Sequence, residues 1–317
     1  MSRADLLPAA AAAAPSPALD PVALLLADKR SPATKRAYAG DLRDFFGEEP
    51  GPGVVRAFVS LPAPELALRL ATYKATLIQR GAAEATVNRR LSAVRSLLKY
   101  CHRLGYAQSD GRNLVESEKA QTYRDTRGVD LATMRKLIRL PGKKGVAGLR
   151  DTALLRLLCE NALRRAEVCA LDVADWRESE RRLMVLGKGQ GTQKAPITAS
   201  RPLANALSAY LAAAGHRDGA LFRNLDHRPE HAGERLTPNG LYELVQGYGK
   251  RLGVPQLSPH RLRHSAITAA LDATNGDVRR VQKLSRHRDI RTLTIYDDNR
   301  HDHQGDVSES LAALLGS

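Results

Sequence analysis

Prolines and glycines divide the first hundred residues into short helices, and this punctuation restricts the fold more than any other feature. Pro21 and Pro32 each follow a capping Asp or Ser, which is the pattern of a helix start. Gly47, Gly81 and Gly105 each follow an apolar stripe, where glycine favours a helix end. The pattern predicts an all-helical beginning rather than a sheet.

Apolar residues between these stops recur at the spacing of one helix face, in four segments that start near residues 21, 32, 64 and 86. We interpret residues 20–106 as one all-α domain, because about ninety residues is a normal domain size. Residues 1–19 are low in complexity and are predicted to be a disordered tail. The polar, aperiodic residues 107–129 are predicted to be a linker.

A second domain is predicted over residues 130–317, where the pattern changes. Residues 182–198 indicate two short strands around a glycine-rich turn. Helical patterns surround this hairpin; they occupy 130–140, 148–163, 201–214, 237–252, 259–274, 277–285 and 289–299, with a short amphipathic tail at 306–315. The predicted fold class is mainly α with a small antiparallel β-sheet: an all-α N-terminal domain and a mixed α+β C-terminal domain.

The charge of the chain points to a polyanionic partner. Its 317 residues contain 49 Lys and Arg against 34 Asp and Glu, a net charge of +15. DNA is the favoured partner, because 4% aromatic residues supply few stacking platforms for RNA or single strands. No apolar run reaches the roughly 18–20 residues of a spanning helix, so we expect no membrane partner. Three cysteines without CxxC spacing favour a reducing cytoplasm.

A basic face on the helix that begins near residue 86 is a candidate DNA contact. It carries Arg89, Arg90, Arg95 and Lys99. Two interpretations of such a face remain open: an ordinary solvated surface, or a surface that binds DNA phosphates.

The densest group of chemically active residues lies in the predicted helix 259–274. His260, Arg263 and His264 fall at i, i+3 and i+4, on one helix face. The histidine spacing matches a zinc-protease helix, but Arg261 occupies the place of the general-base Glu, so no metal is expected.

The surrounding sequence suits a phosphate. Residues 260–291 contain eight Lys or Arg and three Asp. Mg²⁺ prefers carboxylate oxygens, whereas arginine forks meet phosphate oxygens directly. Metal-free cleavage would also need a nucleophile, and Tyr296 follows His287 by nine residues.

In order and spacing, these residues resemble the tyrosine recombinases, or phage-type integrases. ALRRAEVCALDVADW places Arg164 and Glu167 at the first arginine and its following acid, and LGKGQGTQKAPI places Lys188 on the hairpin. His260, Arg263, His287 and Tyr296 complete the set. SPATKRAYAGDLRDFF and ATVNRRLSAVRSLLKYCHRLGY also resemble helices of the family's core-binding domain.

The resemblance implies site-specific DNA recombination without metal or cofactor. Tyr296 would form a 3′-phosphotyrosine bond, with His260 as general base and Lys188 as the acid that protonates the leaving 5′-oxygen. The phosphate would be held by three residues, Arg164, Arg263 and His287. Glu167 and His264 would support these groups without reacting.

The resemblance also implies partners and a location. We expect double-stranded DNA with a specific recombination site, a monomer free in solution and a homo-tetramer on synapsed DNA, in an Xer-like, cytoplasmic, nucleoid-associated protein. The tail 306–315 would dock on a neighbouring protomer through Leu311, Leu314 and Leu315, although packing on its own domain stays open.

The chain departs from the family pattern at three places. Ser285-Arg286 replaces the usual Leu-Gly before the second histidine, and Arg286 could contact phosphate or pack outward. Asn161-Ala162 replaces Thr-Gly before the first arginine. The hairpin offers Lys194 as a weaker alternative to Lys188. Type IB topoisomerase activity and a non-catalytic DNA-binding regulator are the rival functions.

Overall fold

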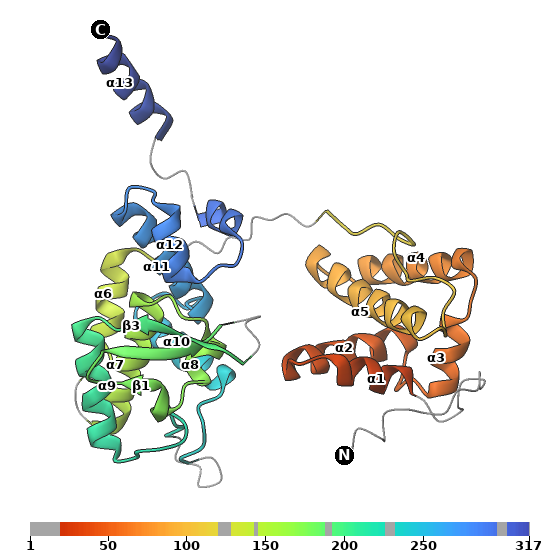
Figure 1. Cartoon of the computed structure of the whole chain (residues 1–317), viewed down its shortest axis with the longest axis horizontal. Helices are drawn as coiled ribbons and strands as arrows, with labels where there is room; N and C mark the ends of the chain where they lie inside the picture. The colour runs from red at the N-terminus through yellow and green to blue at the C-terminus, as the bar shows by residue number, and fades with distance from the viewer. Residues whose placement is uncertain are drawn as a thin grey trace. The chain divides into compact units, whose positions relative to one another are not determined.

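The computed structural model describes residues 20–119, 128–142, 145–187, 192–225, 232–296 and 303–316. The chain divides into two compact units, Met1–Thr122 and Tyr123–Ser317 (Figure 1). The predicted tail, residues 1–19, and the candidate Lys188 lie outside the described residues.

The described part of the first unit is all helical, as predicted. Its helices are α1 (Pro21–Asp28), α2 (Pro32–Phe46), α3 (Pro52–Val59), α4 (Ala63–Gln79) and α5 (Glu84–Arg103). The predicted caps form: the Asp20 carboxylate accepts from the N–H of Val22 and Ala23, and Gly47 ends α2 in the left-handed conformation with φ 83°.

Helix α3 was not predicted. Its eight residues begin after Gly51, and so short a segment gives little periodicity to detect. Tertiary packing explains its presence, because Val55, Phe58 and Val59 are buried in the core of the first unit. Phe58 joins Phe45 in an edge-to-face contact with ring centroids 5.1 Å apart.

Helix α5 forms the centre of this unit, packed against α1, α2 and α4. The first half of the predicted linker also packs here. Ala107 is buried in the same core, and the Asn88 side chain exchanges hydrogen bonds of 2.9 and 2.8 Å with the backbone of Glu118. Residues 107–118 therefore belong to the N-terminal unit. Sequence polarity could not reveal this, because the segment is irregular and its contacts depend on tertiary packing.

The second unit surrounds α7 with helices and a small sheet (Figure 1). Its helices are α6 (Leu131–Arg139), α7 (Gly145–Glu160), α8 (Arg165–Cys169), α9 (Arg201–Ala214), α10 (Pro238–Arg251), α11 (Pro259–Ala273), α12 (Val278–Ser285) and α13 (His303–Leu315). Helix α7 packs against α6, α8, α9 and α11. Its apolar residues are buried almost all round, as expected of a central helix.

The sheet of the second unit is antiparallel, in the order β1-β2-β3. The two predicted strands are β2 (Arg182–Leu186) and β3 (Lys194–Thr198), and they pair with Leu186 opposite Lys194. The two-residue β1 (Trp176–Arg177) is too short to predict from alternation. It follows a short 3-10 helix, η2 (Val173–Asp175).

The predicted helix 289–299 is instead a 3-10 segment, η3 (Ile290–Tyr296), in the described residues. Leu293 is fully buried in the core, and η3 packs against α11 and α12. No helix in the described ranges is long and apolar enough to cross a membrane.

Two glycines of α10 give a matched test of this packing. A Cβ at Gly249 would lie 2.5 Å from the Leu257 Cβ and 2.6 Å from the Val254 carbonyl oxygen, whereas a Cβ at Gly247 would meet nothing within 4 Å. We expect Gly249→Ala to lower the free energy of unfolding by about 1–3 kcal/mol through overpacking. Gly247→Ala should raise it by up to about 1 kcal/mol. Urea unfolding of both variants measures this, and equal stabilities would contradict the packing of α10.

Candidate active site

The site begins at the turn before α8, where Arg164 occupies the N-cap. Helix N-termini leave backbone N–H groups without intrahelical partners. Glu167 returns to this end and accepts from the Arg164 N–H at 2.9 Å and from its Nη1 at 2.8 Å. The same carboxylate therefore fixes both the start of α8 and the guanidinium of Arg164. Ala162, just ahead, has φ 48°, so the chain makes this turn without the usual glycine.

Arg263 on α11 is buried and joins three segments. Its Nη1 donates to the Ala162 carbonyl at the turn before α8. Its Nη2 donates to the Ser285 carbonyl at the end of α12 at 2.5 Å, and lies 3.1 Å from His287 Nε2. An arginine has five N–H donors in a planar fork, which suits such a junction. Arg164, Arg263 and His287, distant in sequence, are thereby brought together.

His287 is neutral at physiological pH in this setting. Burial, followed by the charges of Arg263, Arg164 and Arg286, lowers the pKa of His287 to about 4. A neutral imidazole can donate one hydrogen bond to a phosphate oxygen without adding charge to the arginine cluster.

Arg286 turns inward. Arg286 is the C-cap of α12, with φ 55° in the left-handed region, and its side chain is 12% exposed. Nη2 donates to Glu167 Oε2 at 2.9 Å, and Nη1 donates to the Leu284 carbonyl at 2.9 Å. The sequence left phosphate contact and outward packing open; the structure places the side chain on Glu167 instead.

Glu167 is 5% exposed and carries the negative charge of the cluster. Burial alone would raise its pKa, but the Arg164 N–H and the guanidinium groups of Arg286 and Arg164 hold the pKa of Glu167 below its ordinary value. The sequence predicted a supporting role for Glu167. It did not predict that Arg286, as well as Arg164, donates to the Glu167 carboxylate.

The remaining predicted residues differ in how far the structure describes them. His260 is exposed in the first turn of α11, on the helix face of Arg263. His264 is buried on α11, with Nδ1 3.4 Å from the Thr268 hydroxyl. Tyr296 is the last residue of η3, which packs beside the two helices that hold Arg263 and Arg286.

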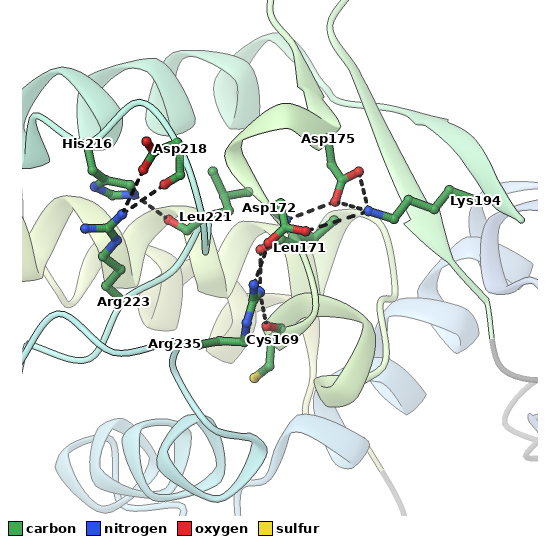
Figure 2. Close-up of polar contacts among 10 residues, drawn as sticks. All are labelled: Cys169, Leu171, Asp172, Asp175, Lys194, His216, Asp218, Leu221, Arg223 and Arg235. Carbon is green, nitrogen blue, oxygen red and sulfur yellow. Dashed lines mark hydrogen bonds and ion pairs between the residues drawn. The ribbon is translucent and has the colours of Figure 1, made fainter. Parts of the chain in front are cut away.

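Lys194 has a structural partner. Its Nζ lies 2.6 and 2.7 Å from the two carboxylate oxygens of Asp175, which is buried (Figure 2). Asp175 also accepts from the Asp172 N–H at 2.9 Å. Arg235 holds the same segment by donating to the Asp172 carboxylate and the Cys169 carbonyl. The ion pair therefore anchors the start of β3 to the segment that follows α8.

The basic face of α5 is only partly open. Arg89 and Arg90 form ion pairs with two acids of α2, Asp41 and Asp44 respectively. Arg95 donates to the backbone of the 107–118 segment at Val115. Lys99 is exposed. The acids of α2 were the signal missed in the sequence. Within the described ranges, no group of three or more His, Cys, Asp or Glu side chains is placed to hold a metal ion.

Both units match models of known protein families. Residues 130–303 match the phage integrase family, and residues 22–105 match the phage integrase N-terminal SAM-like domain. A tyrosine recombinase from Synechocystis sp. is 45% identical over 298 residues, covering 92% of this chain and 94% of the relative. A tyrosine recombinase from Synechococcus elongatus is 44% identical over 312 residues, covering 96% and 97%.

Solved structures share the fold. A lambda integrase dimer bound to a core site matches with a TM-score of 0.64 at 13% identity, covering 89% of this chain and 94% of that one. The XerH site-specific recombinase in a post-cleavage complex matches with a TM-score of 0.62 at 18% identity, covering 88% and 79%.

A helical unit followed by a helix-and-sheet unit with clustered arginines defines the class of the protein, a site-specific DNA recombinase. The chain belongs to the phage integrase family, whose curated relatives here carry the name tyrosine recombinase.

The low pKa of His287 gives a direct test of the site's electrostatics. In the DNA-free protein, the imidazole should titrate near pH 4, well below the unfolded value of about 6.5. The unfolded chain then binds the proton first, so folding stability should fall as the pH drops from 6.5 to 4. NMR titration, assigned with His287→Gln, measures the midpoint, and His287→Gln should lose less stability over this range. A midpoint near 6.5 would contradict the burial of His287 among the arginines.

Proposed function

We propose that this recombinase cleaves and rejoins double-stranded DNA at a specific site, with Tyr296 attacking the scissile phosphorus. The attack forms a 3′-phosphotyrosine bond and releases a 5′-hydroxyl, which keeps the phosphodiester energy for rejoining. The observation that supports this most is the junction at Arg263, which links the Arg164 turn, the Arg286-His287 turn and α11. The segment that carries Tyr296 packs on the same helices.

The arginines take the electrostatic part of the reaction. Arg164 and Arg263 would bind the non-bridging oxygens, because charge develops there in the transition state and fixed donors stabilise it without reorganising. Neutral His287 would add a hydrogen bond. Arg164 and His287 are half-buried, and Arg263 is buried.

Proton transfer falls to His260 and Lys188. A free tyrosine has a pKa near 10, so it needs a base at neutral pH. His260 is an exposed imidazole on the face of Arg263, which suits a base that meets incoming substrate. Lys188 would protonate the 5′-oxygen, and the pairing of Lys194 with Asp175 supports this choice between the two lysines.

Assembly is the second part of the proposal. Helix α13 exposes Leu311, Leu314 and Leu315 to 53%, 82% and 83%. An exposed apolar group of this kind favours docking on another protomer, and head-to-tail docking can close a ring. The assembly would be a monomer in solution and a tetramer on two DNA sites, in the cytoplasm and associated with the nucleoid.

Covalent trapping tests the nucleophile. The DNA site is first selected from a library of nicked duplexes with randomised repeats, by capture of covalent complexes with the wild-type chain. The nick lets the 5′-hydroxyl fragment leave, so the complex accumulates. We expect a protein–DNA band on a denaturing gel from wild type, with and without EDTA, and none from Tyr296→Phe. An equal band from Tyr296→Phe would refute the assignment, and loss of the band with EDTA would support a metal mechanism. Relaxation of any supercoiled plasmid, without site preference, would favour a topoisomerase.

Substitution of the two hairpin lysines should have different effects on the cleavage rate in the same assay. Lys188→Met removes the proposed acid and should slow cleavage by about 10²-fold or more, within the range usual for general acids. Lys194→Met removes an ion pair that is 35% exposed on the lysine side, so it should change mainly stability. A 5′-phosphorothiolate leaving group, which needs no proton, should restore cleavage by Lys188→Met. A larger rate loss for Lys194→Met, rescued in the same way, would reverse the assignment.

A further inference from the structure

Arg286 is a non-glycine residue held at φ 55°, ψ 37°, in the left-handed region. The left-handed conformation costs an ordinary residue about 1 kcal/mol, and glycine there is free of that cost. Backbone strain of this kind clusters at functional sites, which directs attention to what the side chain contacts. Glycine, the more usual residue at this position of the family, would avoid the strain but would lack those contacts.

The contacts of Arg286 show what it supplies. Its guanidinium meets Glu167 Oε2 at 2.9 Å, across 119 positions of sequence. The other oxygen of Glu167 accepts from Arg164 Nη1 at 2.8 Å. One buried carboxylate thus binds two guanidinium groups, one from the turn before α8 and one from the end of α12.

The link also crosses the site. Arg286 Nη1 reaches the Asn161 carbonyl at 3.4 Å, so the turn that carries His287 is attached to the turn that carries Arg164. Both Nη atoms of Arg286 are engaged by protein, Nη2 by the Glu167 carboxylate and Nη1 by backbone carbonyls. Its charge therefore acts on Glu167.

We propose that Arg286 is a positioning residue of the recombinase: through Glu167 it holds Arg164 and the His287 turn in the geometry that binds the scissile phosphate. The inference rests on the proposed function, because it assigns Arg286 to the same reaction. Arg286 forms no bond to DNA in this scheme. Its effect should appear in the rate of the bound complex rather than in DNA affinity.

The test measures single-turnover formation of the covalent complex on the selected nicked duplex. We expect Arg286→Met to lower the rate at saturating protein about tenfold, the effect of a coupling of about 1.4 kcal/mol, which is usual within one ion-pair network. The half-saturating protein concentration should stay within about twofold. Arg286→Lys, which keeps the charge but not the planar fork, should recover part of the rate. Arg217→Met, an exposed arginine outside the 260–291 cluster with the same charge change, is the matched control and should keep the wild-type rate.

A double-mutant cycle tests whether Arg286 acts through Glu167. If it does, Arg286→Met should slow Glu167→Gln by less than about twofold further, because the partner is already lost. If the rate losses of Arg286→Met and Glu167→Gln instead multiply in the double mutant, the proposal is overturned. A direct phosphate contact would also reduce the slope of log affinity against log salt by about 0.9 in Arg286→Met, whereas positioning leaves the slope unchanged.

Arg286→Gly separates positioning from folding. Glycine removes the strain at φ 55°, so the melting temperature should not fall by more than a few degrees while the cleavage rate falls as in Arg286→Met. A wild-type rate in Arg286→Gly would overturn the proposal. Because the wild-type and Tyr296→Phe lanes are run alongside, failure of the proposed function shows as absence of a wild-type complex, and failure of this inference shows as unchanged rates in a chain that still cleaves.

Discussion

The arrangement of the candidate site depends on one buried carboxylate. Bringing the guanidinium groups of Arg164, Arg263 and Arg286 together creates mutual repulsion that must be offset before DNA arrives. Glu167 accepts from Arg164 and Arg286, and the Ala162 and Ser285 carbonyls accept from Arg263. The cluster is therefore held by protein acceptors in the absence of phosphate, which keeps its donors in place for an incoming phosphodiester.

This electrostatic arrangement also explains the state of His287. Burial, reinforced by the charges of Arg263, Arg164 and Arg286, holds the pKa of His287 well below its ordinary value. The packing that gathers the arginines thus also keeps the neighbouring imidazole neutral. This lowering of the pKa requires fixed positions for the arginines and the histidine. The packing of α8, α11 and α12 with α7 and the core provides those positions.

Much of the fold follows from local sequence. Proline starts, glycine stops and apolar periodicity predicted α1, α2, α4 and α5 close to their observed bounds, and the helical prediction at 201–214 coincides with α9. Helix α3, strand β1 and the packing of residues 107–118 were missed, because they depend on tertiary contacts rather than on periodicity. The segment 289–299 was predicted as a regular helix, but its described part is 3-10, with the single residue Leu293 anchored in the core.

The order and spacing of Arg164, His260, Arg263, His287 and Tyr296 determined the family and the chemistry to expect, because reactive groups at fixed intervals are legible without coordinates. The tertiary structure decided how some of these and neighbouring groups are held. Lys194 is committed to Asp175, and three basic residues of α5 are bound by acids or backbone of their own unit. Arg286 turns inward to Glu167. Sequence shows which charges a chain carries, but the partner of each charge is set by segments that only folding brings within hydrogen-bond distance.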